Sequence, residues 1–150
     1  MSAYVRRLVN LVAAPVLLVG LVVTASACKG YNPLNPSEFG IQATDIVAGS
    51  GTQLRQGRGA TVHYTLWLYD ETKPEGKGTQ LQTTVGGQTF SFAFGYGQVI
   101  SGWDIGLDGM KVGGTRRLVI PPAYAYGASG SGQIPGNATL VFDIQLVGVY

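Results

Sequence analysis

The sequence predicts an α+β domain in which a strongly twisted antiparallel β-sheet wraps around one short α-helix. Three observations lead to this fold class. The 150 residues include 23 glycines, and only 12% are charged. Short runs of β-branched and aromatic residues alternate with turn residues, as in strands joined by tight turns. Only one segment has the apolar spacing of a helix. A chain of this length can bury one modest core, so we expect a single domain.

The first 27 residues read as a secretory signal peptide. Arg6 and Arg7 form a short basic start, residues 11–23 are mostly apolar, and small residues follow. Basic, apolar and small-residue segments in this order are typical of a cleaved leader. A proline and a glycine interrupt the apolar run, which argues against a permanent membrane-spanning helix, because such a helix needs about 20 apolar residues.

Cys28 is the only cysteine of the chain, so it has no partner for an internal disulfide. It follows Ser26 and Ala27, and Ser-Ala-Cys resembles the end of a bacterial lipobox, in which the cysteine becomes the lipid-modified first residue of the mature protein. A diacylated Cys28 would anchor the protein to a membrane of the cell envelope, in the periplasm or on the outer surface. The alternative is cleavage after Ala27, which would leave a soluble secreted or periplasmic protein with a free thiol. Residues 28–39 contain two Asn-Pro steps and no hydrophobic period, so we expect an extended linker.

The folded domain is expected to span residues 40–150. Residues 61–69 predict a strand, because Val62, Leu66 and other apolar residues alternate along it. A polar loop with a proline and two glycines follows at 70–78. The same alternation predicts further strands at 90–94, 115–120 and 140–147, and weaker strand candidates lie at 41–47 and 52–55.

The helical segment is expected to begin near Ser101. Trp103, Leu107 and Met110 fall at positions i, i+4 and i+7, and Ser101 with Asp104 has the spacing of a capping box. So short a helix is stable only when a curved sheet covers its apolar side. The aromatic residues of the domain exceed what so small a core needs, which predicts an aromatic-lined pocket between sheet and helix. The residues concerned are Tyr64, Phe90, Trp103, Tyr126 and Phe142.

The net charge of the domain argues against a nucleic-acid partner, and the residue types argue against a metal site. The net charge of +2 includes Arg6 and Arg7 of the leader, so the domain carries about no net charge and we expect no nucleic-acid partner. His63 stands alone on a strand, where we expect a structural role, and the ligand types for a metal are not clustered in the sequence. We therefore expect no metal and no cofactor. Arg116 and Arg117 are expected to form a solvated face.

Four segments resemble the FKBP domain in the same order along the chain, at residues 62–70, 92–114, 116–132 and 134–149. The most specific motifs are Gln-Val-Ile-x-Gly-Trp at 98–103, Tyr-x-Tyr-Gly at 124–127 and Ala-Thr-Leu-x-Phe-Asp at 138–143. On these motifs the chain is identified as a member of the FKBP-type peptidyl-prolyl cis/trans isomerases.

The resemblance implies a half-barrel of about five strands around a short helix, with a shallow hydrophobic pocket that receives a proline ring. The catalytic positions carried over by motif are Tyr64, Ile100, Trp103, Tyr126 and Phe142. The substrate-binding positions are Leu81, Gln82, Phe90, Val99 and Ile134. The resemblance further implies that Trp103 forms the pocket floor, and that the Ile100 N–H and the Tyr126 hydroxyl donate hydrogen bonds to the peptide carbonyls.

The sequence departs from the family pattern at one wall of this pocket. Most active members carry Phe-Asp and two small hydroxyl residues where this chain has Leu81, Gln82, Thr83 and Thr84. A ring is lost at position 81 and a negative charge at position 82, and Ser131 replaces a ring-bearing residue in the loop that closes over the pocket. We therefore expect reduced isomerase activity and only weak binding of macrolides such as tacrolimus and rapamycin.

These residue types suit prolyl isomerisation, which changes no covalent bond. Rotation about a peptide bond costs about 18–20 kcal/mol because it breaks amide resonance. The twisted amide is less dipolar than the planar one, so a dry aromatic pocket favours the transition state. We expect a monomeric isomerase that acts on proline-containing polypeptides and assists folding of cell-envelope proteins. The alternatives are a proline-peptide-binding chaperone or scaffold with little turnover, and a small-molecule-binding surface lipoprotein.

Overall fold

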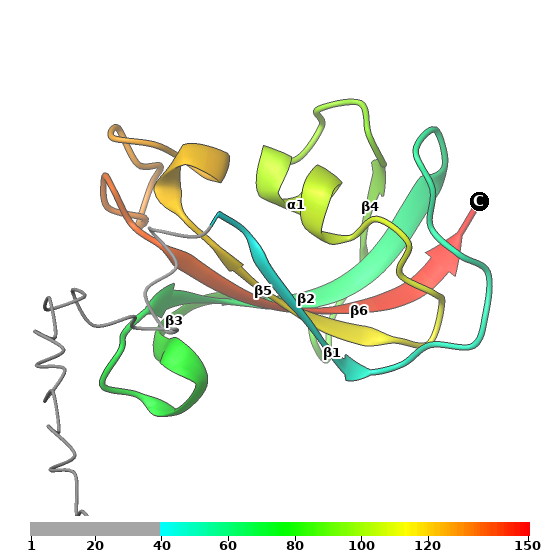
Figure 1. Cartoon of the computed structure of the whole chain (residues 1–150), viewed down its shortest axis with the longest axis horizontal. Coiled ribbons are helices and arrows are strands. Elements are labelled where there is room, and N and C mark those ends of the chain that lie inside the picture. The colour runs from blue at the N-terminus through cyan, green and yellow to red at the C-terminus, as the bar shows by residue number, and fades with distance from the viewer. Residues whose placement is uncertain (1–39) are drawn as a thin grey trace, which may run out of the picture. The chain divides into compact units, whose positions relative to one another are not determined.

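The computed structural model describes residues 40–150, and its elements form one antiparallel sheet with a short helix over the concave face (Figure 1). The predictions for the signal peptide, Cys28 and the linker lie outside the described residues. The helix α1 covers Ser101–Gly106, and two 3-10 turns, η2 and η3, cover Pro74–Gly76 and Pro122–Tyr124. The strands are β1 (Gln42–Val47), β2 (Gly59–Tyr69), β3 (Lys77–Thr83), β4 (Phe90–Ala93), β5 (Thr115–Ile120) and β6 (Leu140–Val149).

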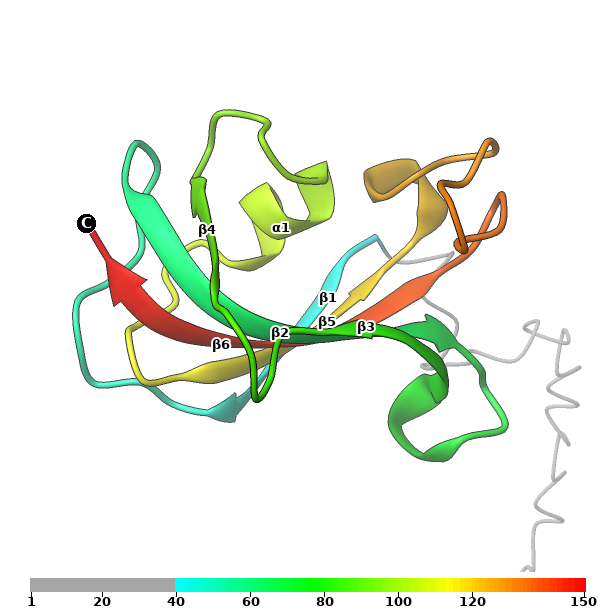
Figure 2. The same cartoon turned by 180° about the vertical axis from the view of Figure 1, so that it is seen from behind.

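The strands follow the order β1-β5-β6-β2-β3, and β4 also pairs with β2. The first part of β2 pairs with β4 and its second part with β3, so the long strand β2 joins both (Figure 2). The curvature of the sheet lets it wrap around α1. This arrangement confirms the predicted fold class, a twisted antiparallel sheet around one short helix.

The hydrophobic core fills the space between α1 and the concave face of the sheet. Val62 and Leu66 of β2, and alternate residues of β6, lie in it, as the sequence pattern predicts. The predicted apolar side of the helical segment is also confirmed, because Trp103, Leu107 and Met110 are all buried. No helix within residues 40–150 is both long and apolar enough to cross a membrane.

Two glycines allow α1 to lie directly on β5. A Cβ atom at Gly102 would come within 2.5 Å of the Ile120 side chain, and one at Gly106 within 2.7 Å of Leu118. Both distances are shorter than real Cβ contacts, so with any larger residue either the helix or the facing side chain of β5 would have to move. The glycines that weaken the helical pattern in the sequence are therefore required by its packing.

Two predictions about local structure are wrong. Ser101 is the first residue of α1 and not its cap, and no side chain caps the helix. The Ser101 hydroxyl instead lies 3.4 Å from the carbonyl oxygen of Tyr124. Residues 52–55 do not form a strand, because only Gln53 pairs, in a single bridge to Lys111.

Arg116 and Arg117 lie on opposite faces of β5, and both are largely buried against partners, so the prediction of a solvated face is wrong. Arg116 binds Asp45 at 2.6 Å and donates to the carbonyl oxygens of Gly106 and Asp108 at 2.9 and 3.0 Å. It therefore satisfies carbonyls at the C-terminal end of α1.

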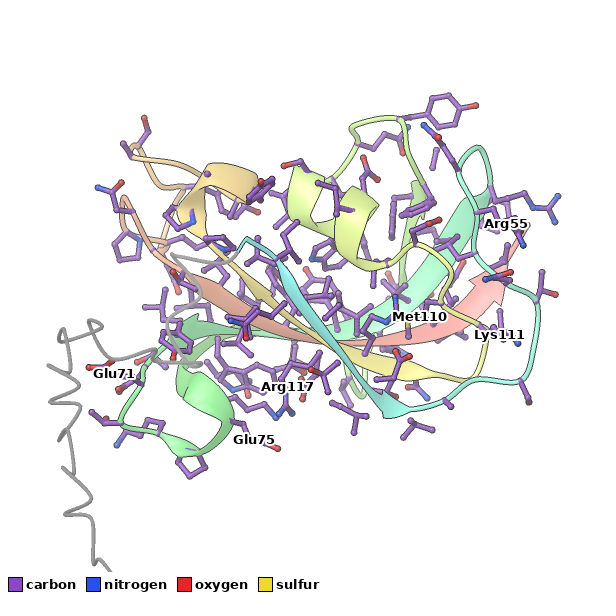
Figure 3. All side chains as sticks on the ribbon, viewed as in Figure 1. Arg55, Glu71, Glu75, Met110, Lys111 and Arg117 are labelled. Atoms are coloured by element: carbon purple, nitrogen blue, oxygen red, sulfur yellow. The ribbon has the colours of Figure 1, made fainter. Side chains whose placement is uncertain are left out.

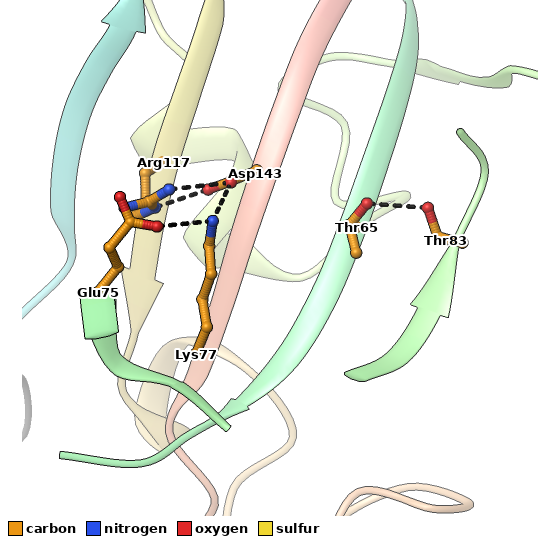
Figure 4. Close-up of polar contacts among 6 residues, drawn as sticks. All are labelled: Thr65, Glu75, Lys77, Thr83, Arg117 and Asp143. Carbon is orange, nitrogen blue, oxygen red and sulfur yellow. Dashed lines mark hydrogen bonds and ion pairs between the residues drawn. The ribbon is translucent and has the colours of Figure 1, made fainter. Parts of the chain in front are cut away.

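The outer face of the sheet carries a network of four charged residues (Figure 4). Arg117 binds Asp143 at 2.7 Å and Glu75 at 2.9 Å, while Lys77 binds the same two carboxylates at 2.7 and 2.9 Å. The Lys77 ammonium also lies 4.6 Å from the centre of the Trp67 ring. The network ties η2 and the start of β3 to β5 and β6.

The segment around η2 shields part of this outer face. Val141 precedes the core residue Phe142 on β6 and pairs with Trp67, so its side chain faces away from the main core. It is nevertheless fully buried. The polar loop after β2, which lies on the side of the sheet opposite α1 (Figure 1), therefore covers a small apolar patch as well as connecting two strands.

Candidate functional site

A pocket of about 400 Å³ opens between α1, the adjoining strands and the segment after β5. Eight of the ten predicted pocket residues line it, and Leu66, Gly97 and Gln98 complete the lining. Leu66 lies two residues after Tyr64 on the same face of β2, so its place could have been predicted from the alternation. The predicted residues in the lining are Tyr64, Gln82, Phe90, Val99, Ile100, Trp103, Tyr126 and Phe142.

Leu81 and Ile134 do not line the pocket. Leu66 pairs with Gln82 and Trp67 with Gln80, so Leu81 has no partner on β2 and forms a bulge. Both Leu81 and Ile134 are partly buried and pack against the core from the side. The bulge therefore directs Gln82, and not its neighbour, into the site.

Trp103 lies at the centre of a cluster of aromatic rings. The Trp103 ring is edge-on to Tyr64 at a centroid distance of 5.2 Å, to Phe142 at 5.3 Å and to Phe90 at 6.1 Å. The ring of Phe92 lies 5.5 Å away. Only 4% of Trp103 is exposed. Edge-to-face rings pack favourably, and here they build a rigid apolar floor and walls.

Several polar groups at the pocket make no hydrogen bond within residues 40–150. These are the hydroxyls of Tyr64 and Tyr126, the Gln82 carboxamide and the backbone N–H of Ile100. The Trp103 Nε1 atom is also buried without a partner in this part of the chain. Burial, and then the nearby Tyr126, raises the pKa of Tyr64, so its hydroxyl stays protonated at neutral pH. The site thus holds free donors at an otherwise apolar surface.

The loop between β4 and α1 is fixed by side-chain contacts. The Asp104 carboxylate accepts hydrogen bonds from the N–H groups of Gly95 and Gly97 at 2.9 and 3.1 Å. Gln98 accepts one from the N–H of Ala93 at 2.8 Å. Gly95 and Gly97 have φ angles of 83° and 67°, which favour glycine. The loop can therefore present Val99 and Ile100 in one conformation.

The loop after η3 is closed on itself by backbone hydrogen bonds. Ser131 and Ile134 exchange two, at 2.9 and 2.8 Å, and the N–H of Asn137 donates to Gly127 at 2.8 Å. Among the residues of this loop, only Tyr126 at its start lines the pocket. Residues 128–136 do not line the pocket.

The described residues offer no centre for metal-dependent or acid–base chemistry at this site. No three His, Cys, Asp or Glu side chains within residues 40–150 come together as metal ligands. The single histidine, His63, lies 3.3 Å from the hydroxyl of Thr84 and does not line the pocket. The arrangement suits binding and reorientation of a small apolar group.

Comparison with known proteins agrees with this geometry. Residues 50–147 match the family model of the FKBP-type peptidyl-prolyl cis-trans isomerases. The chain is 42% identical over 112 residues to an FK506-binding protein of Neisseria meningitidis serogroup B, which covers 74% of this chain and 97% of the relative. It is 44% identical over 109 residues to FK506-binding protein 1 of Gibberella zeae, with coverage of 72% and 96%.

Two further matches differ in how much of the relative this chain covers. The chain is 43% identical over 111 residues to the 46 kDa FK506-binding nuclear protein of Spodoptera frugiperda, covering 73% of this chain but only 26% of that relative. The crystal structure of AtFKBP13 superposes with a TM-score of 0.63 at 32% identity, covering 73% of this chain and 93% of that one. The same order of motifs, the same sheet around one helix and the sequence identity lead to one conclusion: this chain belongs to the family of FKBP-type peptidyl-prolyl cis-trans isomerases.

Proposed function

We propose that this isomerase assists the folding of cell-envelope proteins, and that its pocket receives the proline ring of a polypeptide on the face of Trp103. The observation that carries the proposal is an apolar, ring-lined pocket with unpartnered donors beside it. The Ile100 N–H and the Tyr126 hydroxyl are free to hold the carbonyls of a bound peptide, while the aromatic walls exclude water from the prolyl bond. The planar amide loses more solvation there than the twisted one, which lowers the barrier to rotation.

The proposal is tested by measuring prolyl isomerisation in a proline tetrapeptide with detergent-solubilised full-length protein. Tyr126→Phe should lower kcat/KM by roughly tenfold, because it removes one hydrogen bond to the substrate. Tyr124→Phe is the matched control, because Tyr124 is also partly exposed but does not line the pocket. Loss of activity in both variants, or in neither, would contradict the proposed role of the Tyr126 hydroxyl.

A second candidate function is a chaperone or scaffold module that holds proline-containing segments with little turnover. Two observations favour it. The carboxamide of Gln82 stands in the wall where most relatives in the family carry an aspartate, and residues 128–136 do not line the pocket. These features also support reduced isomerase activity and weak binding of tacrolimus or rapamycin. Peptide binding without acceleration of isomerisation would favour the module over the enzyme.

The location in the cell envelope rests on the N-terminal sequence alone, since Cys28 lies outside the described residues. We propose that Cys28 is lipidated and anchors the domain, through residues 29–39, to a membrane. Wild-type protein should incorporate labelled palmitate and Cys28→Ala should not. Absence of label from both would contradict the anchor and leave cleavage to a soluble protein.

A further inference from the structure

We infer that the pocket accepts prolyl bonds regardless of the charge on the residue that precedes the proline, and that Gln82 is the residue that determines this indifference. The inference rests on the proposed function, because it concerns how the same pocket chooses among polypeptides. It concerns the preference for charge in the residue before the proline, which neither family membership nor the shape of the pocket defines.

The sequence places no charge on the segments that build the pocket. No Asp, Glu, Lys, Arg or His occurs between Thr79 and Trp103, or between Leu118 and Phe142. These two segments contribute every lining residue except Tyr64 and Leu66 of β2, and those two are uncharged as well. The walls and the loops beside the opening are therefore electrically neutral.

The charged residues of the domain lie outside the pocket lining, and six of the fourteen form ion pairs with one another. In Figure 3, Arg55 and Lys111 lie at one end of the molecule and Glu71 and Glu75 at the other. Glu75 belongs to the network of four charges that neutralise one another on the outer face of the sheet, and Arg116 binds Asp45.

Two charged residues directly follow a lining residue in the chain: Asp143, which belongs to the network on the outer face of the sheet, and Asp104. The Asp104 carboxylate faces the backbone N–H groups of Gly95 and Gly97, which hydrogen-bond both of its oxygens. Those donors stabilise its charge, and Asp104 is not among the residues that line the pocket. The field that a charged peptide side chain meets at the opening is consequently weak.

Gln82 is the position in the pocket wall at which a charged side chain would lie beside the bound peptide. It is paired with the core residue Leu66, lines the pocket with Tyr64 and Tyr126, and its carboxamide has no hydrogen-bond partner among the described residues. Gln82 is exposed to solvent, so a charge here would be partly screened and would act most strongly at low salt. A carboxylate at this position would repel an acidic side chain beside the proline and attract a basic one, each by roughly fourfold in affinity.

Gln80 provides a matched control on the same strand. The bulge at Leu81 places Gln80 opposite Trp67, on the outer face of the sheet, where its side chain is exposed. A glutamate at position 80 adds the same charge to β3 without placing it in the pocket.

The test compares three peptides that differ only in the residue before proline, which is Glu, Gln or Lys, using full-length protein at low and at physiological salt. We expect the wild-type kcat/KM values to agree within about threefold at both salt concentrations, because no charge lies in the pocket. Gln82→Glu should lower the ratio of the Glu peptide to the Lys peptide at least tenfold at low salt, with partial recovery in salt. Gln80→Glu should leave the ratio unchanged.

Two results would overturn the inference: a wild-type protein that rejects the Glu peptide tenfold, or a Gln82→Glu variant with an unchanged ratio. Failure of the proposed isomerase function gives a different result, in which no peptide is turned over. In that case the Glu and Lys peptides are compared by their dissociation constants, measured by the fluorescence change on titrating each peptide. The same expectations then apply to the ratio of their affinities. Absence of both turnover and binding for all three peptides would contradict the inference and the proposed function together.

Discussion

The carboxylate of Asp104 accepts a hydrogen bond from the backbone N–H of Gly95 at 2.9 Å and so joins the helix to the loop that precedes it. Its other oxygen binds the N–H of Gly97 at 3.1 Å. The contact matters for the site because the same loop continues into Val99 and Ile100, which line the pocket. An aspartate that the sequence pattern assigns to helix capping thus holds one rim of the pocket.

Replacing Asp104 by alanine should loosen this rim. Two hydrogen bonds to a charged acceptor are lost, and we expect a fall of about 2 kcal/mol in the free energy of unfolding. We also expect a several-fold fall in kcat/KM, because the Ile100 N–H is no longer held in place. Urea denaturation and the isomerase assay measure the two effects. Asp108→Ala is the control, since the Asp108 carboxylate makes no hydrogen bond or ion pair among residues 40–150. Equal effects in the two variants would contradict this role.

Replacing Gly106 by alanine should separate α1 from β5. The new Cβ atom would lie 2.7 Å from Leu118, so the helix or the side chain must move, at a cost of about 1–3 kcal/mol. Thermal unfolding would show the loss. Gly87→Ala adds the same methyl group where the nearest atom is 3.7 Å away, and it should unfold close to the wild-type temperature. A stable Gly106→Ala variant would show that the helix has room to shift.

The outer-face network should make the domain sensitive to acid. Hydrogen bonds from Arg117 and then Lys77 lower the pKa of Glu75 to about 2. Burial raises the pKa of Asp143, but the hydrogen bonds and charges of Arg117 and Lys77 outweigh this, and its pKa lies below the ordinary value. Carboxylates with a lowered folded-state pKa stabilise the fold fully above the unfolded-state pKa, and this contribution disappears as the pH falls through the folded-state pKa.

For Glu75 this window runs from its ordinary pKa of 4.5 down to about 2. The unfolding temperature of the wild-type protein should therefore fall across this range, and Glu75→Gln should make this fall smaller. The contribution of Glu75 should be modest, because its side chain is 54% exposed. Glu71→Gln, which alters a residue that forms no ion pair in the described part of the chain, should leave it unchanged. Identical slopes for all three proteins, measured by thermal unfolding at several pH values, would contradict the contribution of the network.

Isomerase activity, in contrast, should vary little with pH between about 5 and 9. The pocket lining contains no carboxylate, amine or imidazole, and the raised pKa of Tyr64 keeps its hydroxyl protonated over this range. A bell-shaped profile of kcat/KM in this interval would show that an ionisable group outside the lining takes part.

The sequence predicts the strands that carry a clear hydrophobic alternation, because that alternation reflects burial of one face. The predicted strand at 115–120 coincides with β5, and the prediction at 140–147 is extended by two residues in β6. By contrast, β3 could not be predicted in this way. Its sequence, KGTQLQT, is almost entirely polar, since most of this edge strand is exposed.

The sequence predicts more of the pocket lining than of the contacts that hold the lining in place. Family motifs identify Trp103 and Tyr126, and both line the cavity, but the exact face of each β3 residue depends on the bulge at Leu81, which no local pattern indicates. The partners of Arg116 and Arg117 lie 71 and 26 residues away in the chain. Such pairings arise from strand order, so the sequence alone suggests only exposed arginines.

The buried Val141 beneath the η2 segment has a consequence for engineering of the domain. Shortening the connection between β2 and β3 would leave a valine and the side of Trp67 facing water, and would remove Glu75, which binds both Arg117 and Lys77, from the ion network. A protein shortened in this way should expose an apolar patch on the outer face of the sheet and tend to aggregate, even though the prolyl pocket on the other side of the sheet remains intact.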